Sequence, residues 1–234
     1  MKLKSLLIEA GGKEPGKLEI KGLTYDKALS YLIHRVNVSD EKWEKFLKKF
    51  KKNFELLKVL VEPGYTERKD MPVVSSSQVE KLQQCLEQGK LDIINHKTKK
   101  YHKSFPHGLS EEQAKEWLKY GLKDGSLKDD IVKTNISKKT AKSLIPIQGQ
   151  IYFDTAINKI IDRGISKIKK YINDGTYLII SKDNYIMDGH HRWTAAILFD
   201  PSITINCLVV DIPKEKLIEL LLAYGEAIGN ERNL

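Results

Sequence analysis

A β-hairpin, a glycine and a helix follow one another between residues 176 and 200, and this succession constrains the fold more than any other part of the chain. Residues 176–181 are β-branched and aromatic, 182–184 form a turn triplet, and 185–187 resume an extended apolar pattern, which together predict the hairpin. Beyond Gly189, apolar residues recur at helical spacing until Pro201, and residues 203–210 then read as a strand. The pattern predicts an α/β fold of the α+β kind, with a small mixed sheet and flanking helices.

Polar side chains are concentrated at the joint between the hairpin and the helix. Gly189 lacks a Cβ, so it can adopt a left-handed turn and let a ligand approach the backbone. The N–H groups of the first helical turn favour an anion, and Arg192 adds a planar fork suited to phosphate oxygens. His190 and His191 can donate hydrogen bonds to a phosphate or move a proton. The candidate ligand-binding residues of this phosphate pocket are Asp188, Gly189, His190, His191, Arg192 and Thr194.

Other interpretations of the same joint stay open. Asp188 can simply cap the helix that follows, and a histidine near a helix start is often only a structural hydrogen-bond donor. A zinc site is less expected, because adjacent histidines point to different sides of a helix and no third ligand stands at metal spacing nearby. We therefore assign no metal ligands.

The segment Asp-Gly-His-His-Arg-Trp-Thr-Ala at 188–195, with its hairpin before and its helix and strand after, resembles the central motif of the ParB/sulfiredoxin superfamily. It is most similar to the free serine kinases that use ATP or ADP and to phage-encoded ParB-like proteins. The resemblance covers residues 141–234 and implies a nucleotide-phosphate site at the turn. His190 stands where sulfiredoxins have a catalytic cysteine, and the Gly-Glu-Arg-Arg form of the CTP-binding ParB proteins is missing.

In that superfamily the domain opens with a strand and a short polar segment that closes over the nucleotide. The matching stretch here is 143–154, which makes Gln148, Gln150 and Asp154 the polar candidates. The serine kinases use a glutamate near this region as general base, and Asp154 is the carboxylate that can substitute for it. Asp154 also fits the N-cap of a helix that starts at Thr155.

Residues 1–140 are rich in lysine and in helical patterns, which predicts a mostly helical, basic region of unknown type. Thr24 and Ser39 are expected to cap two helices, the second with an apolar face of Trp43, Phe46, Leu47, Phe50, Phe54 and Leu57 and many lysines elsewhere. Capping boxes at Ser77 and Ser110 predict helices over 78–88 and 111–122, and residues 3–8 and 17–20 are short strand candidates. In the second region, helices are expected over 155–174 and 214–228. The polar stretch 133–142 is the expected boundary between regions 1–140 and 141–234.

The chain is basic, with a net charge of +9, and residues 95–108 form a basic loop with interleaved aromatic residues. Such a loop can stack on bases and neutralise phosphates, although charge runs are usually solvated surface. No stretch is apolar enough to span a membrane, and Cys85 and Cys207 are expected to be reduced thiols, so we expect a soluble, cytoplasmic protein.

Two functional hypotheses follow. The first is a nucleotide-dependent phosphotransferase (kinase) or nucleotide hydrolase, with ATP, ADP or CTP and Mg²⁺ as cofactors and Asp154, His190 and His191 as catalytic candidates. The alternative is a ParB-like DNA-binding protein in which the nucleotide is a regulatory ligand, or a ParB-like nuclease.

Overall fold

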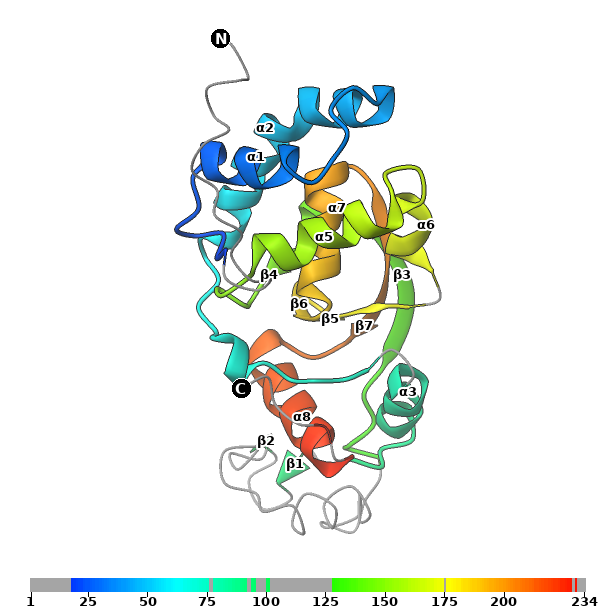
Figure 1. Ribbon diagram of the computed structural model, residues 1–234. Coiled ribbons are helices and arrows are strands. Elements are labelled where there is room, and N and C mark those ends of the chain that lie inside the picture. The colour runs from blue at the N-terminus through cyan, green and yellow to red at the C-terminus, as the bar shows by residue number, and fades with distance from the viewer. Residues whose placement is uncertain are drawn as a thin grey trace. The chain divides into compact units, whose positions relative to one another are not determined.

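The computed structural model describes residues 18–75, 78–91, 94–95, 100–101, 128–174, 176–228 and 230 of the chain. It divides into two compact units, each assembled from three separate segments. Unit 1 comprises residues 1–66, 139–175 and 189–205, and unit 2 comprises 67–138, 176–188 and 206–234. The elements of both units are drawn and labelled in Figure 1.

Two helices open the described part of unit 1, each with a side-chain cap. Helix α1 (Tyr25–Ile33) follows Thr24, whose hydroxyl accepts the N–H of Lys27 at 3.4 Å. Helix α2 (Glu41–Val61) follows Asp40, whose Oδ1 accepts the N–H groups of Lys42 and Trp43 at 2.8 and 3.4 Å. The prediction for α1 is confirmed, whereas Asp40 caps α2 instead of the expected Ser39. Both residue types are good N-caps, and the sequence pattern alone does not choose between neighbours.

The core of unit 1 forms where α2 meets α5 (Phe153–Arg163) and α7 (His190–Phe199). Phe50 and Phe54 of α2 are fully buried, and each ring centroid lies about 6 Å from that of Phe153, at 6.1 and 5.9 Å. Asn53, also buried on α2, donates from Nδ2 to the carbonyl of Leu198 at 2.9 Å. Fully burying an aromatic or aliphatic side chain of this size stabilises a fold by roughly 1.5–3 kcal/mol. The predicted apolar face of α2 is therefore the side that holds α5 and α7.

Helix α5 begins at Phe153, two residues earlier than predicted, and its N-cap position belongs to Tyr152. The chain then turns at Gly164, where φ is 76°, before the short helix α6 (Ile168–Asn173). Ile168 and Ile172 thus belong to a separate helix, where the sequence suggested one continuous helix up to residue 174.

The five-stranded sheet has the order β3-β7-β5-β6-β4, with β3 at Thr134–Thr140, β7 at Thr204–Val210, β5 at Leu178–Ser181, β6 at Tyr185–Asp188 and β4 at Ile145–Pro146. Strands β5 and β6 are antiparallel and form the predicted hairpin, with Asn184 in its turn at φ 65°. Strands β5 and β7 are parallel, so the sheet is mixed. The expected fold class is confirmed. The stretch expected as a domain boundary forms β3 and the 3₁₀ turn η4 (Ala141–Ser143).

Unit 2 adds α3 (Val79–Glu87) and α8 (Lys214–Ala227), the latter packed on β5 and β6, together with the turn η2 (Arg68–Asp70) and the two-residue strands β1 (Ile94–Asn95) and β2 (Lys100–Tyr101). Helices near the positions of α3 and α8 were predicted. Ser77, the helix expected at 111–122, the strand expected at 3–8 and most of the basic loop lie outside the described residues.

The two cysteines are buried and form no disulfide. Cys85 lies on α3 and Cys207 on β7, as expected. Burial raises the pKa of the Cys85 thiol. Burial, with Cys85 close by, also raises the pKa of Tyr224 to about 12, and the Tyr224 hydroxyl has no hydrogen-bond partner among the described residues. Both groups therefore stay neutral at physiological pH. In the part of the chain that the structure describes, no helix is long and apolar enough to cross a membrane.

Candidate functional site

The predicted glycine turn lies at the start of α7. Gly189 occupies the N-cap position with φ 96° and ψ 18°, a left-handed conformation that costs other L-residues roughly 1–2 kcal/mol. Its carbonyl accepts the N–H groups of Arg192 and Trp193, both at 3.0 Å, which starts the helical hydrogen-bond ladder. Because the cap residue has no side chain, no side-chain cap bond forms. Asp188 is the last residue of β6, so it does not take the N-cap position that the capping interpretation gave it.

His190 is buried, with 4% of its surface exposed, and its ring faces the predicted polar segment. Its Nε2 accepts a hydrogen bond from the backbone N–H of Gln148 at 3.3 Å. A backbone amide can only donate, so Nε2 carries the lone pair and the ring is neutral in this arrangement. Two of the candidate ligand-binding residues, Gln148 and His190, are thus hydrogen-bonded to one another, and His190 is an acceptor here, whereas the sequence suggested that it donates to a phosphate.

Residues 147–151 form a loop that main-chain hydrogen bonds hold in place; we call it the Gln148 loop. The carbonyl of Ile147 accepts the N–H groups of Tyr65 and Thr66, both at 3.1 Å, and Gly149 donates to the carbonyl of Thr66 at 2.9 Å. The side chain of Gln148 donates to the carbonyl of Gln150 within the loop. The Gln148 loop is therefore fixed on one side by residues 64–66 and on the other by His190.

Two glycines make this arrangement possible, and neither was singled out from the sequence. A Cβ on Gly64 would lie 2.6 Å from the carbonyl oxygen of Gln148, and a Cβ on Gly149 would lie 2.5 Å from that of Gly64. Lys21 joins them, because its Nζ donates to the Gly64 carbonyl at 2.6 Å and lies 3.2 Å from the Cβ position of Gly149. Sequence reasoning missed Lys21 and Gly64. Lys21, residues 64–66 and the Gln148 loop are far apart in the chain, and no local pattern links them.

The remaining residues of the first turns of α7 differ in exposure. His191 and Arg192 are partly exposed, but His191 Nε2 and Arg192 Nη1 are buried atoms, so part of each polar group is turned away from water. Thr194 is fully buried, and its hydroxyl makes no hydrogen bond within the described part of the chain. Of the α7 residues predicted to bind a ligand, Gly189, His191 and Arg192 are thus the ones near the surface.

Asp154 is the second residue of α5 and is fully buried. Its Oδ1 accepts the N–H of Leu18 at 3.4 Å, and the Leu18 carbonyl accepts the N–H of Phe153 at 2.8 Å. The carboxylate therefore contributes to the antiparallel contact between residues 18–20 and 151–153, where an isolated bridge joins Glu19 and Tyr152. Its position does not match the helix cap considered from the sequence.

The site in unit 1 combines main-chain donors with basic side chains. The start of a helix attracts anions through its dipole and its first N–H groups, and Arg192 lies in that first turn. The Gln148 loop lies beside it through His190, and its own amide donors are used internally: the Gln148 N–H donates to His190 and the Gln148 side chain donates to the Gln150 carbonyl. No group of three or more His, Cys, Asp and Glu side chains that could hold a metal ion occurs among the described residues. The start of α7 and the guanidinium of Arg192 are therefore suited to binding an oxyanion.

Comparison with protein-family models, with curated proteins and with solved structures found no match to this chain.

Proposed function

We propose that this chain binds a nucleotide with its phosphates at the first turn of α7, and that it transfers or hydrolyses the terminal phosphate. The observation that carries the proposal is the start of α7: a glycine cap at φ 96° with no side-chain cap bond, followed directly by two histidines and an arginine. The resemblance of residues 188–195 to the ParB/sulfiredoxin motif supports the same assignment.

Each residue has a distinct part in this proposal. The main-chain N–H groups of the first turn and the guanidinium of Arg192 bind phosphate oxygens, and the Gln148 loop covers the nucleotide. His190 positions that loop through its bond from Gln148. We assign proton transfer to His191 in preference to Asp154, because the Asp154 carboxylate is fully buried and accepts the Leu18 N–H. Magnesium carried by the nucleotide phosphates would offset their charge, as in other phosphoryl transfers.

The test is a panel of labelled ATP, ADP, CTP and GTP with magnesium, read for binding, for release of phosphate and for transfer to free serine, a nucleoside or DNA. Replacing Arg192→Ala should weaken nucleotide binding by at least about tenfold, the loss expected for one charge-assisted hydrogen bond of about 1.5–3 kcal/mol.

Arg163→Ala is the matched control, because Arg163 is an exposed arginine of the same unit that stacks on the ring of Tyr171 at 4.1 Å. It should bind nucleotide like the unaltered protein. Full affinity in Arg192→Ala, or no nucleotide bound by the unaltered chain, overturns the proposal.

A further inference from the structure

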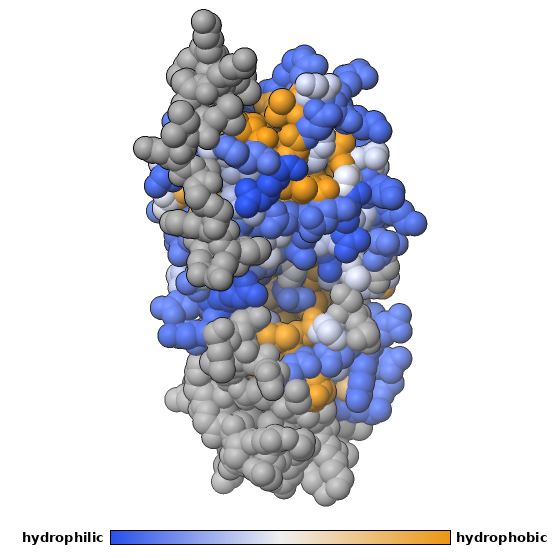
Figure 2. Space-filling view, in the orientation of Figure 1, coloured by the Kyte–Doolittle hydropathy of each residue, from blue (hydrophilic) through white to orange (hydrophobic). Residues whose placement is uncertain are grey.

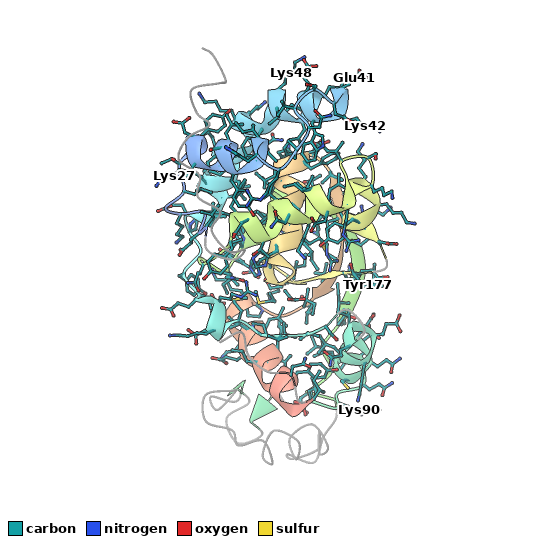
Figure 3. The ribbon with its side chains drawn as sticks, viewed as in Figure 1. Lys27, Glu41, Lys42, Lys48, Lys90 and Tyr177 are labelled. Carbon is teal, nitrogen blue, oxygen red and sulfur yellow. The ribbon has the colours of Figure 1, made fainter. Side chains whose placement is uncertain are left out.

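Helix α2 carries much of the positive charge of the chain. Its 21 residues include seven lysines and three glutamates, which give it a net charge of +4 out of +9 for the whole protein. The apolar side of α2 is used in the core through Phe46, Phe50 and Phe54. The lysines are therefore left on the sides that do not pack, as Figure 3 shows for Lys42 and Lys48, which lie at the outer side of the helix.

Four of these lysines follow one flank of the helix. Lys42, Lys45, Lys49 and Lys52 are spaced by three, four and three residues, which places them on one side of a helix with 3.6 residues per turn. All four are exposed, and we call them the lysine stripe. At 1.5 Å per residue the stripe runs for about 15 Å along the helix axis.

Acidic groups neutralise this flank only in part. Glu41 pairs with Lys45 at 2.5 Å, and Asp200 lies in the field of Lys49 and of Lys169 on α6. Glu44 pairs with Lys48 on the other flank at 2.7 Å. Both ion pairs are highly exposed, and exposed ion pairs of this kind contribute only about 0–1 kcal/mol, so a stronger polyanion can replace the carboxylates. Lys169 extends the positive surface beyond α2.

We propose that the lysine stripe binds the sugar-phosphate backbone of a nucleic acid. A duplex carries one phosphate per about 3.4 Å of each strand, so a stripe of this length faces several phosphates that its flexible side chains can reach. An anionic membrane is the less suitable partner, because amphipathic membrane helices insert their large apolar side chains, whereas the three phenylalanines of α2 are buried in unit 1. Figure 2 shows hydrophilic side chains along the outer edge of the end of unit 1 that carries α2, around a hydrophobic patch. This inference does not rest on the proposed nucleotide site.

The test is binding of a short fluorescent DNA duplex to the full chain, followed by anisotropy over a range of salt concentrations. The triple variant Lys42→Gln, Lys49→Gln, Lys52→Gln should lose at least about tenfold in affinity at low salt, and the slope of log affinity against log salt should fall by about 2–3. The control is Lys48→Gln, Lys51→Gln, Lys58→Gln, which removes the same charge from the other flank of α2 and should lose much less. Far-ultraviolet circular dichroism and thermal unfolding establish that both variants are folded.

Three outcomes overturn the proposal: no binding of the duplex by the unaltered chain at low salt, an equal loss in both triple variants, or equally tight binding of polyglutamate or phosphatidylserine vesicles. The first rejects the partner, the second rejects the stripe in favour of general charge, and the third rejects selectivity for nucleic acid. Because nucleotide binding is measured separately, a failure here is distinguishable from a failure of the proposed nucleotide site.

Discussion

Helices α2 and α7 begin in opposite ways. At the start of α2, the Asp40 carboxylate accepts two main-chain N–H groups, so the helix is capped by its own sequence. At the start of α7, Gly189 provides a left-handed turn and no side chain. A capped start adds stability, whereas a glycine start leaves room beside the first-turn amides. The contrast separates a helix start that is closed by its own side-chain cap from one at which we propose that a ligand binds.

The largest expected effect concerns His190, the first residue of α7. Replacing His190→Phe keeps the ring volume but removes the acceptor for the Gln148 N–H, and stranding a buried donor costs about 1–3 kcal/mol. Urea unfolding gives the change in free energy. His191→Phe, at the partly exposed neighbour, is the control and should cost less; equal losses in the two variants contradict the positioning role.

The glycine itself gives the next largest effect. Gly189→Ala should lower the free energy of unfolding by roughly 1–2 kcal/mol because of its positive φ, and the added Cβ should also weaken nucleotide binding. Gly164→Ala introduces a comparable backbone strain at φ 76° between α5 and α6, where no atom lies within 4 Å of the added Cβ. That variant should lose stability with nucleotide affinity unchanged, as measured by calorimetry. A parallel loss of affinity in both variants would attribute the effect to general instability.

At α2 the comparison predicts a stability effect alone. Asp40→Ala removes the cap and should cost about 1 kcal/mol, and Asp40→Asn should recover most of it, because Asn caps helices as well as Asp does. Thermal unfolding measures both, and nucleotide titrations should be identical in the two variants. A change in nucleotide affinity on Asp40→Ala would show that the two helix starts are not independent.

The smallest effect lies at the other end of α7, at Asp200. Burial raises the pKa of this carboxyl, but hydrogen bonds from Ser202 and the charges of Lys49 and Lys169 outweigh it and lower the pKa overall. The stabilising contribution is therefore present above the unfolded value near 3.9 and is lost as pH falls through the lower folded value. Because the group is mostly solvated, Asp200→Asn should cost below about 1 kcal/mol at neutral pH and nothing at strongly acidic pH. A pH-independent difference between the two proteins contradicts this account.

Local patterns in the sequence were sufficient for most elements. The hairpin at β5 and β6, helix α7, strand β7 and the cap of α1 each depend on residues within a few positions, and all were predicted. The break between α5 and α6 was missed because a single glycine inside an apolar-periodic run does not show whether the helix continues.

Local sequence patterns identified only some of the residues that make up the candidate site. The resemblance of residues 188–195 and 143–154 brought Gln148 and His190 into the same hypothesis, and the two are hydrogen-bonded. The parts supplied by Lys21 and residues 64–66 depend on contacts over long sequence separations, which leave no periodic or spacing signal in one sequence. The assignment of Asp154 remained open for the same reason, because its partner Leu18 lies 136 residues away.

The close main-chain approach of Gly64 and Gly149 limits which substitutions this protein can accept during evolution. In each case the atom that a methyl group would strike belongs to the main chain of the opposite segment. A second mutation can shrink a neighbouring side chain but cannot remove a carbonyl, so neither glycine can be rescued by a change in its partner. The two positions must therefore be inherited together, and relatives that retain the Gln148 loop should be recognisable by this pair even where the rest of the sequence has drifted.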